Sequence, residues 1–275
     1  MSRLKLTDKN YHSAEANWQY MSASQYKSFS RCEAMAMAEL RGEWNRKETT
    51  ALLVGSYVDA YFSGELEAFC KEHPDIFTAK GDLKADFVKA INAISRLEKD
   101  ELAKMLLSGR HQVIKTVKIG GVWYKSKIDS LLSPAQVEKI CKKFPKIRSL
   151  VPFGGSIIVD LKYIKDIEPI WDENQMAKVS FINYWGYDYQ GSIYQKADKR
   201  SSPFVIVAVT KQEEPDVAAL SVPDAELAAL LAEVEENSPR YAAIKRGEIE
   251  PVGCGKCAYC RSVKKLTGIK NYTEL

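Results

Sequence analysis

The spacing of apolar side chains divides the chain near residue 110. Up to that point apolar residues recur mainly at helical spacing, which predicts helices. Ser22 and Gln25 have the spacing of a capping box, in which each side chain satisfies a free backbone donor, and they mark a helix start. We predict that residues 1–20 are irregular, with local order only if they pack on something. The other predicted segments are helices over 22–40 and 47–62, and a helical region over 65–108 that is interrupted around 74–81.

From residue 113 the pattern changes to an alternation of apolar and polar residues, which is typical of β-strands. Gly120 and Gly121 separate two such runs and favour a two-residue hairpin turn. We predict strands over 113–119, 122–131, 156–163, 204–210 and 218–222, a loop over 164–174, and helices over 134–143, 174–199 and 223–246. Pro239 is expected to break or kink the last helix. One integrated domain with a C-terminal tail is the simplest interpretation.

The strand that reads SIIVDLKY, residues 156–163, carries two charges in an apolar run. Because side chains alternate across a strand, Ile157, Val159, Leu161 and Tyr163 are expected on one face, and Ile158, Asp160 and Lys162 on the other. Burying a carboxylate and an ammonium is costly unless they are paired or bind a metal. The alternative is an ordinary strand with a surface salt bridge.

Polar residues of interest also lie in three other predicted elements. Asp129 is near the end of a hairpin strand, Asp59 follows Gly55 by one helical turn, and Gln190 and Tyr194 are neighbours on one helix face. Each has a simpler interpretation. Both aspartates are then solvated acids, and the tyrosine belongs to an aromatic stripe that packs in the core.

Composition narrows the class of protein without giving a function. Of the 275 residues, 45% are hydrophobic, which suffices for a sizeable core. We find no apolar run long enough for a membrane span and no apolar block of a signal peptide, so we expect a cytoplasmic protein without membrane partners. The formal net charge of +4 is too small to predict nucleic-acid binding and does not oppose it.

Three of the six cysteines lie close together in the C-terminal tail, as Cys254, Cys257 and Cys260. The spacing C-x2-C-x2-C lets one loop offer three thiolates to an iron–sulfur cluster or to zinc. A fourth ligand would come from the remaining cysteines, which are Cys32, Cys70 and Cys141. The alternative is a tail that binds no metal.

The order of these motifs resembles the RecB-type branch of the PD-(D/E)XK nucleases, and most closely the phage and prophage exonuclease VIII-like (RecE-like) members. The likeness rests on the segments GSYVD, KIDSL, IIVDLKY and GYDYQGSIYQ, and it covers about residues 22–200. It implies a restriction-endonuclease-like α/β (α+β) core, with a central mixed β-sheet flanked by helices after an N-terminal helical region. We expect one nuclease domain over 1–275, with a helical region over 22–110, a catalytic core over 111–222, and a C-terminal helix and cysteine tail over 223–275.

The resemblance also implies the roles of single residues. Asp129, Asp160 and the backbone carbonyl of Leu161 would bind Mg²⁺ or Mn²⁺, which prefer oxygen ligands. Lys162 would orient or deprotonate the attacking water, or stabilise charge in the transition state. The DNA strand would be positioned by residues of the predicted helix over 174–199, namely Gln190, Tyr194 and Tyr187.

This sequence departs from the family pattern in two places. Asp59 stands where the family usually has a histidine that binds the metal, and aspartate is also a suitable ligand for a hard cation. The first hairpin strand reads VIKTVK and lacks the acid that exonuclease VIII-like proteins often have there.

By the same resemblance, Cys32 would join Cys254, Cys257 and Cys260 around a structural [4Fe–4S] cluster, with zinc as the alternative. The implied function is a metal-dependent DNA exonuclease of phage or prophage recombination that acts on duplex ends. Its implied partners are DNA, a single-strand annealing protein and further copies of the chain in a homo-oligomer. Two other functions stay open. One is a DNA-binding protein on a degenerate nuclease scaffold, and the other is an endonuclease or the nuclease subunit of a larger complex.

Overall fold

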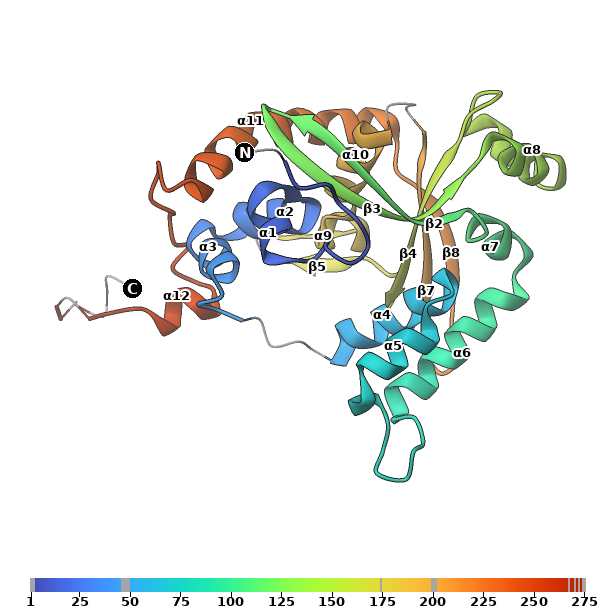
Figure 1. Ribbon diagram of the computed structural model, residues 1–275, viewed down its shortest axis with the longest axis horizontal. Helices are drawn as coiled ribbons and strands as arrows, with labels where there is room; N and C mark the ends of the chain where they lie inside the picture. Colours follow the sequence, from blue (N-terminus) through green and yellow to red (C-terminus); the bar gives the residue numbers. More distant parts are fainter. Residues whose placement is uncertain are drawn as a thin grey trace.

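The fold is built on one twisted mixed β-sheet (Figure 1). The computed structural model describes residues 3–45, 50–173, 175–198, 202–266, 268, 269, 271 and 273. The strand order is β1-β3-β4-β7-β8, with β2 also paired to β3. The strands are β1 Met21–Ser22, β2 Arg110–Ile119, β3 Val122–Leu132, β4 Ile157–Ile164, β7 Phe204–Thr210 and β8 Val217–Ser221. Strands β4 and β7 are parallel, whereas β2–β3, β3–β4 and β7–β8 are antiparallel, so the expected mixed sheet is confirmed.

Strand β3 has two different neighbours along one of its edges. Its other edge pairs with β2 over almost its whole length. On the shared edge, Tyr124 and Lys125 pair with β1, and Ser130 to Leu132 pair with β4. Strands β1 and β4 thus pair with opposite ends of β3, and residues 126–129 lie between them without a ladder partner on this edge. We call this gap between β1 and β4, beside residues 126–129 of β3, the wedge.

Helices cover both faces of the sheet and enclose two apolar cores (Figure 1). On one face lie α2 Ala23–Arg31, α3 Glu33–Arg41, α9 Phe181–Trp185, α10 Tyr187–Asp198 and α11 Asp224–Lys245. On the other lie α4 Thr50–Ser63, α5 Leu66–Glu72, α6 Ala85–Lys99, α7 Glu101–Leu106 and α8 Pro134–Lys143, together with the 3-10 turns η1 Pro74–Ile76 and η2 Pro145–Ser149. Ile157, Val159 and Leu161 pack in the second core, and Ile158 packs in the first, as the alternation predicted.

Two segments that were each predicted as one helix are interrupted in the structure. The helix expected over 22–40 ends at Arg31 and restarts at Glu33, because Cys32 has an extended backbone with φ −168° and ψ 107°. The helix expected over 174–199 is also wrong as a single element. Strands β5 Ile170–Asp172 and β6 Ala177–Val179 form a small hairpin, and α9 and α10 then meet at Gly186, whose φ is +64°. The predicted ends at 47, 174 and 199 lie outside the described residues.

The N-terminal stretch was expected to be irregular, with local order only where it packs on something, and its second half is ordered against Lys125 and Lys245. It contains α1 Ala14–Gln19, which leads into β1. Helix α11 runs through Pro239 without a break, contrary to the prediction. Proline donates no hydrogen bond to the carbonyl one turn earlier, that of Glu235, and the Gly120 turn packs against this carbonyl. No described helix has the length and apolar character to span a bilayer.

Candidate active site in the wedge of the sheet

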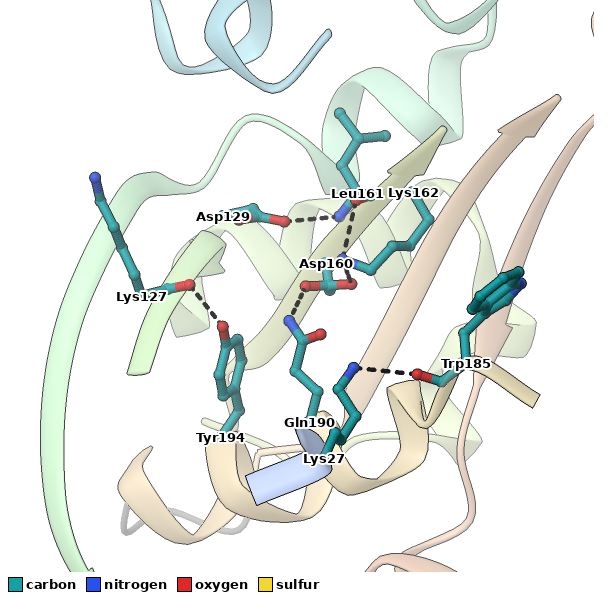
Figure 2. A network of polar contacts seen from close by, with 9 residues as sticks. All are labelled: Lys27, Lys127, Asp129, Asp160, Leu161, Lys162, Trp185, Gln190 and Tyr194. Carbon is teal, nitrogen blue, oxygen red and sulfur yellow. Dashed lines mark hydrogen bonds and ion pairs between the residues drawn. The ribbon is translucent and has the colours of Figure 1, made fainter. Parts of the chain in front are cut away.

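Asp129 lies at the point where β3 and β4 separate. Its carboxylate Oδ2 accepts a hydrogen bond of 3.0 Å from the backbone N–H of Leu161 (Figure 2). The β2–β3 ladder includes Val113–Ile128 and His111–Ser130 but skips the pair at Asp129 and Gln112, where Gln112 has φ +51°. The local irregularity therefore lets an aspartate side chain take the place of a ladder bond to β4.

Asp160 and Lys162 form an ion pair on β4, on the face that the sequence predicted (Figure 2). Lys162 Nζ lies 2.5 Å from Asp160 Oδ2 and donates a hydrogen bond of 3.4 Å to the Leu161 carbonyl. The Asp160 side chain is only 1% exposed, so this is a buried pair and not a surface salt bridge. The contact does not have the angles of a hydrogen bond, and Asp160 Oδ2 accepts none among the described residues.

Helix α10 brings Gln190 and Tyr194 to the same place (Figure 2). Gln190 Nε2 donates a hydrogen bond of 2.6 Å to Asp160 Oδ1. The hydroxyl of Tyr194 donates to the Lys127 carbonyl at 3.0 Å, which ties α10 to the unpaired part of β3. The helix reaches this close because Gly191 faces the sheet: a Cβ there would lie 2.5 Å from the Phe204 ring.

Asp59 approaches the other carboxylates from α4, across the sheet edge. A cavity of about 10 Å³ lies between Asp59, Asp129 and Leu161, which is about the volume that one water-sized sphere needs. Asp59 thus lies at the site, although its carboxylate is not in contact with those of Asp129 and Asp160. The ligand atoms of the three acids do not all lie within 4.8 Å of one another, in contrast to the four cysteine sulfurs described below.

The gathered charges shift the pKa values of these groups in a consistent way. Burial raises the pKa of Asp59 to about 7, against the attraction of Lys162 and with a smaller contribution from the repulsion of Asp160. Burial and the charges of Asp160 and Asp59 also raise the pKa of Asp129 well above its usual range. Burial alone would lower the pKa of Lys162, but the three neighbouring carboxylates raise it overall. The three carboxylates therefore carry more negative charge than the Lys162 ammonium, the one that contacts them, can balance.

Two further residues contact this charge cluster, and only one of them was expected. The ring of Tyr187 lies 5.0 Å from Lys162 Nζ and 5.4 Å from Lys27 Nζ, so two ammonium groups share one aromatic neighbour. Lys27 comes from α2 and donates to the Trp185 carbonyl at 3.1 Å (Figure 2). Burial and Lys162 lower the pKa of Lys27 to about 8. No local pattern singles out Lys27, because its neighbours in space lie more than 130 residues away.

A pocket of about 390 Å³ opens beside the carboxylates and is walled by the N-terminal segment. Its lining includes Asp129, Gln190 and Tyr194, together with polar residues of the first 25 positions and two lysines of β3. Lys125 holds the wall in place, because its Nζ donates to the Tyr11 carbonyl and, at 2.7 Å, to Asn17 Oδ1. A segment that the sequence predicted to be irregular therefore forms one side of the candidate site.

The four cysteines that the sequence grouped together also meet in space, away from the wedge. The sulfur atoms of Cys32, Cys254, Cys257 and Cys260 all lie within 4.8 Å of one another. Cys70 and Cys141 belong to no such group among the residues that the structure describes. The chain therefore contains a second candidate metal centre, where its C-terminal tail meets the junction of α2 and α3.

Comparisons with known proteins agree with this geometry. The model of a family described as "PDDEXK-like domain of unknown function (DUF3799)" matches residues 22–138 and 146–263. A crystal structure from Eubacterium rectale, described as a "Putative exonuclease", is 39% identical, with a TM-score of 0.84 over 98% of both chains. A search of curated proteins found no match. The two matched segments span most of the chain, and the protein belongs to this PDDEXK-like family.

Proposed function

We propose that this protein is a metal-dependent nuclease that hydrolyses phosphodiester bonds at the ends of duplex DNA. The observation that carries the proposal is the wedge, where Asp129 and Asp160 meet beside the Leu161 carbonyl and the Lys162 ammonium. Support comes from the PDDEXK-like family and from the neighbour described as a putative exonuclease. Following the resemblance, the proposal includes a role in phage or prophage recombination, an annealing-protein partner and a homo-oligomer.

The residues present fit a hard divalent cation such as Mg²⁺ or Mn²⁺. All the groups that would hold it are oxygens, from Asp59, Asp129, Asp160 and the Leu161 carbonyl, and such cations prefer oxygen ligands. One of these atoms, Asp160 Oδ2, is buried and accepts no hydrogen bond among the described residues. Lys162 contacts both Asp160 and the Leu161 carbonyl, so a cationic group already lies beside two of the proposed ligands. When bound, the cation would supply electrostatic stabilisation of the phosphoryl oxygens and a more acidic water.

The side chains of the site have separate tasks in this proposal. Lys162 would donate hydrogen bonds to the attacking water or to a phosphate oxygen, because its Nζ contacts both Asp160 and the Leu161 carbonyl, two of the proposed metal ligands. Gln190 would fix the orientation of Asp160 through its 2.6 Å hydrogen bond. The hydroxyl of Tyr194 is already bonded to the Lys127 carbonyl, so we assign it to positioning α10 and the wall of the pocket. Tyr187 and Lys27 would face the incoming strand beside Lys162.

One experiment tests the activity and its mode together. Linear and covalently closed circular duplex DNA are incubated with Mg²⁺ or Mn²⁺ and with wild type, Asp160→Ala or Lys162→Ala protein. The matched controls are Asp75→Ala and Lys139→Ala, which change exposed residues of η1 and α8. We expect degradation of linear DNA alone, lost in both site variants and kept in both controls. Cleavage of closed circles would identify an endonuclease instead, and binding without cleavage under either metal would identify a degenerate scaffold.

A further inference from the structure

The four cysteine sulfurs are arranged as the corners of a small tetrahedron. Cys32 Sγ lies 3.6 Å from Cys260 Sγ and 3.8 Å from Cys257 Sγ, and Cys254 Sγ lies 4.0 Å from Cys260 Sγ. All the remaining pairs are within 4.8 Å. Four thiolates that bind a single zinc ion at about 2.3 Å have neighbouring sulfurs about 3.8 Å apart, from the geometry of a regular tetrahedron. Three of the six spacings, at 3.6, 3.8 and 4.0 Å, are close to this value, and the other three do not exceed 4.8 Å.

An iron–sulfur cluster requires a different arrangement of the same four residues. In a [4Fe–4S] cluster each cysteine binds a different iron atom, and the irons are bridged by sulfides that lie inside the ring of cysteines. Thiolates whose mutual distances suit bonds of about 2.3 Å to one central point leave room for one ion and none for eight atoms. The sequence resemblance favoured the cluster, but the distances between the sulfurs do not fit it.

The backbone around the sulfurs is already folded for ligand binding. The N–H of Cys257 donates to Cys254 Sγ at 3.3 Å, and the N–H of Cys260 donates to Cys257 Sγ at 3.4 Å. Cys32 Sγ receives two such bonds, from Met35 N–H at 3.5 Å and Cys254 N–H at 3.4 Å. Gly255 makes the first tight turn possible with a φ of +73°. These donors would spread the negative charge of four thiolates on one divalent ion.

The tail is also attached to α3 by bonds that do not involve sulfur. Ala34 N–H donates to the Val252 carbonyl at 3.1 Å, and Val252 N–H donates to Glu33 Oε2 at 2.8 Å. Arg240 forms a two-bond ion pair with the same Glu33, at 2.6 and 2.9 Å. Figure 1 shows the C-terminal segment with α12 Ala258–Ser262 beside α3. The three tail cysteines are therefore delivered to Cys32 by a docked segment.

We propose that Cys32, Cys254, Cys257 and Cys260 bind one structural zinc ion that joins the α2–α3 junction to the C-terminal tail. This site accounts for the break at Cys32, where the extended backbone between α2 and α3 places the sulfur against the N–H of Cys254 in the tail. Helix α2 ends at this junction and carries Lys27 to the wedge. The ion would thus fix one end of the helix that supplies a lysine to the candidate active site.

Metal analysis of the intact chain tests the proposal without relying on nuclease activity. The protein is purified anaerobically, with both iron and zinc in the growth medium, and zinc, iron and acid-labile sulfide are measured per chain. We expect about one equivalent of zinc, no stoichiometric iron or sulfide, and a colourless protein. Iron and sulfide in several equivalents per chain would overturn the proposal. So would a folded protein with all thiols reduced and no bound metal.

Two variants and one metal exchange complete the test. Cys257→Ser should lose the zinc, whereas Cys141→Ser, which changes a buried cysteine outside the cluster, should retain it. If Cys257→Ser does not fold, replacement of the metal in wild type by Co²⁺ decides the case. Four thiolates around one Co²⁺ give the intense visible absorption of a tetrahedral thiolate site, and a weak octahedral spectrum would contradict the assigned geometry.

Discussion

Replacing Asp59 with asparagine should stabilise the metal-free protein while impairing its function. Asp59 lies with Asp129 and Asp160 in a cluster of three carboxylates, and all three act on Lys162. Neutralising Asp59 removes the cost of burying its charge, which outweighs the attraction of Lys162, but it also removes a proposed metal ligand. Stability and activity should therefore change in opposite directions.

The size of the effect follows from the shift of one pKa. The folded protein raises the pKa of Asp59 from 3.8 to about 7, because the effect of burial, with a smaller contribution from the charge of Asp160, exceeds the opposing attraction of Lys162. A raised carboxyl pKa means that the folded state holds its proton longer, so stability falls as pH rises from about 4 to 7. A shift of about three pKa units corresponds to about 4 kcal/mol when the group is fully ionised. Because the residue keeps partial contact with solvent, we expect about 2 kcal/mol.

Thermal unfolding at pH 8 measures this prediction, since Asp59 is largely ionised there. In EDTA the Tm of Asp59→Asn should exceed that of wild type by about 4–8 °C, the shift expected for about 2 kcal/mol in a chain of this size. Asp75→Asn, at an exposed position, is the matched control and should leave the Tm unchanged. Added Mg²⁺ should raise the Tm of wild type more than that of Asp59→Asn, because a ligand stabilises only the state that binds it.

The reasoning fails if Asp59→Asn has a lower Tm than wild type in EDTA, because the carboxylate is then stabilising. It also fails if the variant gains as much from Mg²⁺ as wild type and cleaves DNA at the same rate. In that case Asp59 has no part in holding the cation, and its place near Asp129 is structural.

Three further substitutions test how the fold supports the site. Gly191→Ala should push α10 away from the sheet, because its Cβ would meet the Phe204 ring at 2.5 Å. Calorimetry should show that the free energy of unfolding falls by about 1–3 kcal/mol, and the rate of DNA cleavage should fall as well. Lys245→Met should lower the free energy of unfolding, measured in urea, by about 2 kcal/mol. The Lys245 ammonium donates to two backbone carbonyls and one side chain of residues 17–25, and all three bonds are lost. An unchanged urea midpoint would contradict this prediction. Asp198→Asn should also lower the free energy of unfolding by about 2 kcal/mol, because Lys115 then loses the anionic partner that lies 2.6 Å away. Salt should not abolish the difference, since the carboxylate is fully buried.

The parts of the fold that depend on local periodicity were predictable. Alternation along residues 156–163 placed Val159 and Ile158 on opposite faces, and they pack in different cores. The double glycine correctly marked the hairpin between β2 and β3. Both signals depend on neighbouring residues in the sequence, and no distant contact overrides them.

What the sequence did not reveal depends on contacts between distant segments. The break at Cys32 occurs where the chain meets a tail more than 220 residues away. The order of residues 11–20 depends on Lys125 and Lys245, which donate to backbone carbonyls of this segment from 114 to 228 positions away. A helical pattern at residue 32, or a polar pattern at residues 1–20, contains no information about such partners.

For the candidate site, the motifs pointed to most of the residues but not to Lys27 or to the arrangement of the side chains. Asp160 and Lys162 were expected side by side, and the structure shows a buried pair. The hydrogen bond from Leu161 N–H to Asp129 was not predictable, because it exists only where β3 changes its neighbour from β1 to β4. The Tyr194 hydroxyl was expected to position DNA, and its hydrogen bond to the Lys127 carbonyl adds a structural task.

The dependence of cleavage on Mg²⁺ concentration, measured with linear duplex DNA for wild type and Asp160→Asn, tests the central claim most directly. Asparagine keeps the size of the side chain and a hydrogen-bonding partner for Gln190, so circular dichroism should show the same fold for both proteins. We predict saturable, Mg²⁺-dependent release of nucleotides by wild type and a loss of about 10²–10³-fold in the variant. Equal rates for the two proteins, or no cleavage by wild type at any Mg²⁺ or Mn²⁺ concentration, would contradict the assignment of the wedge as a nuclease site.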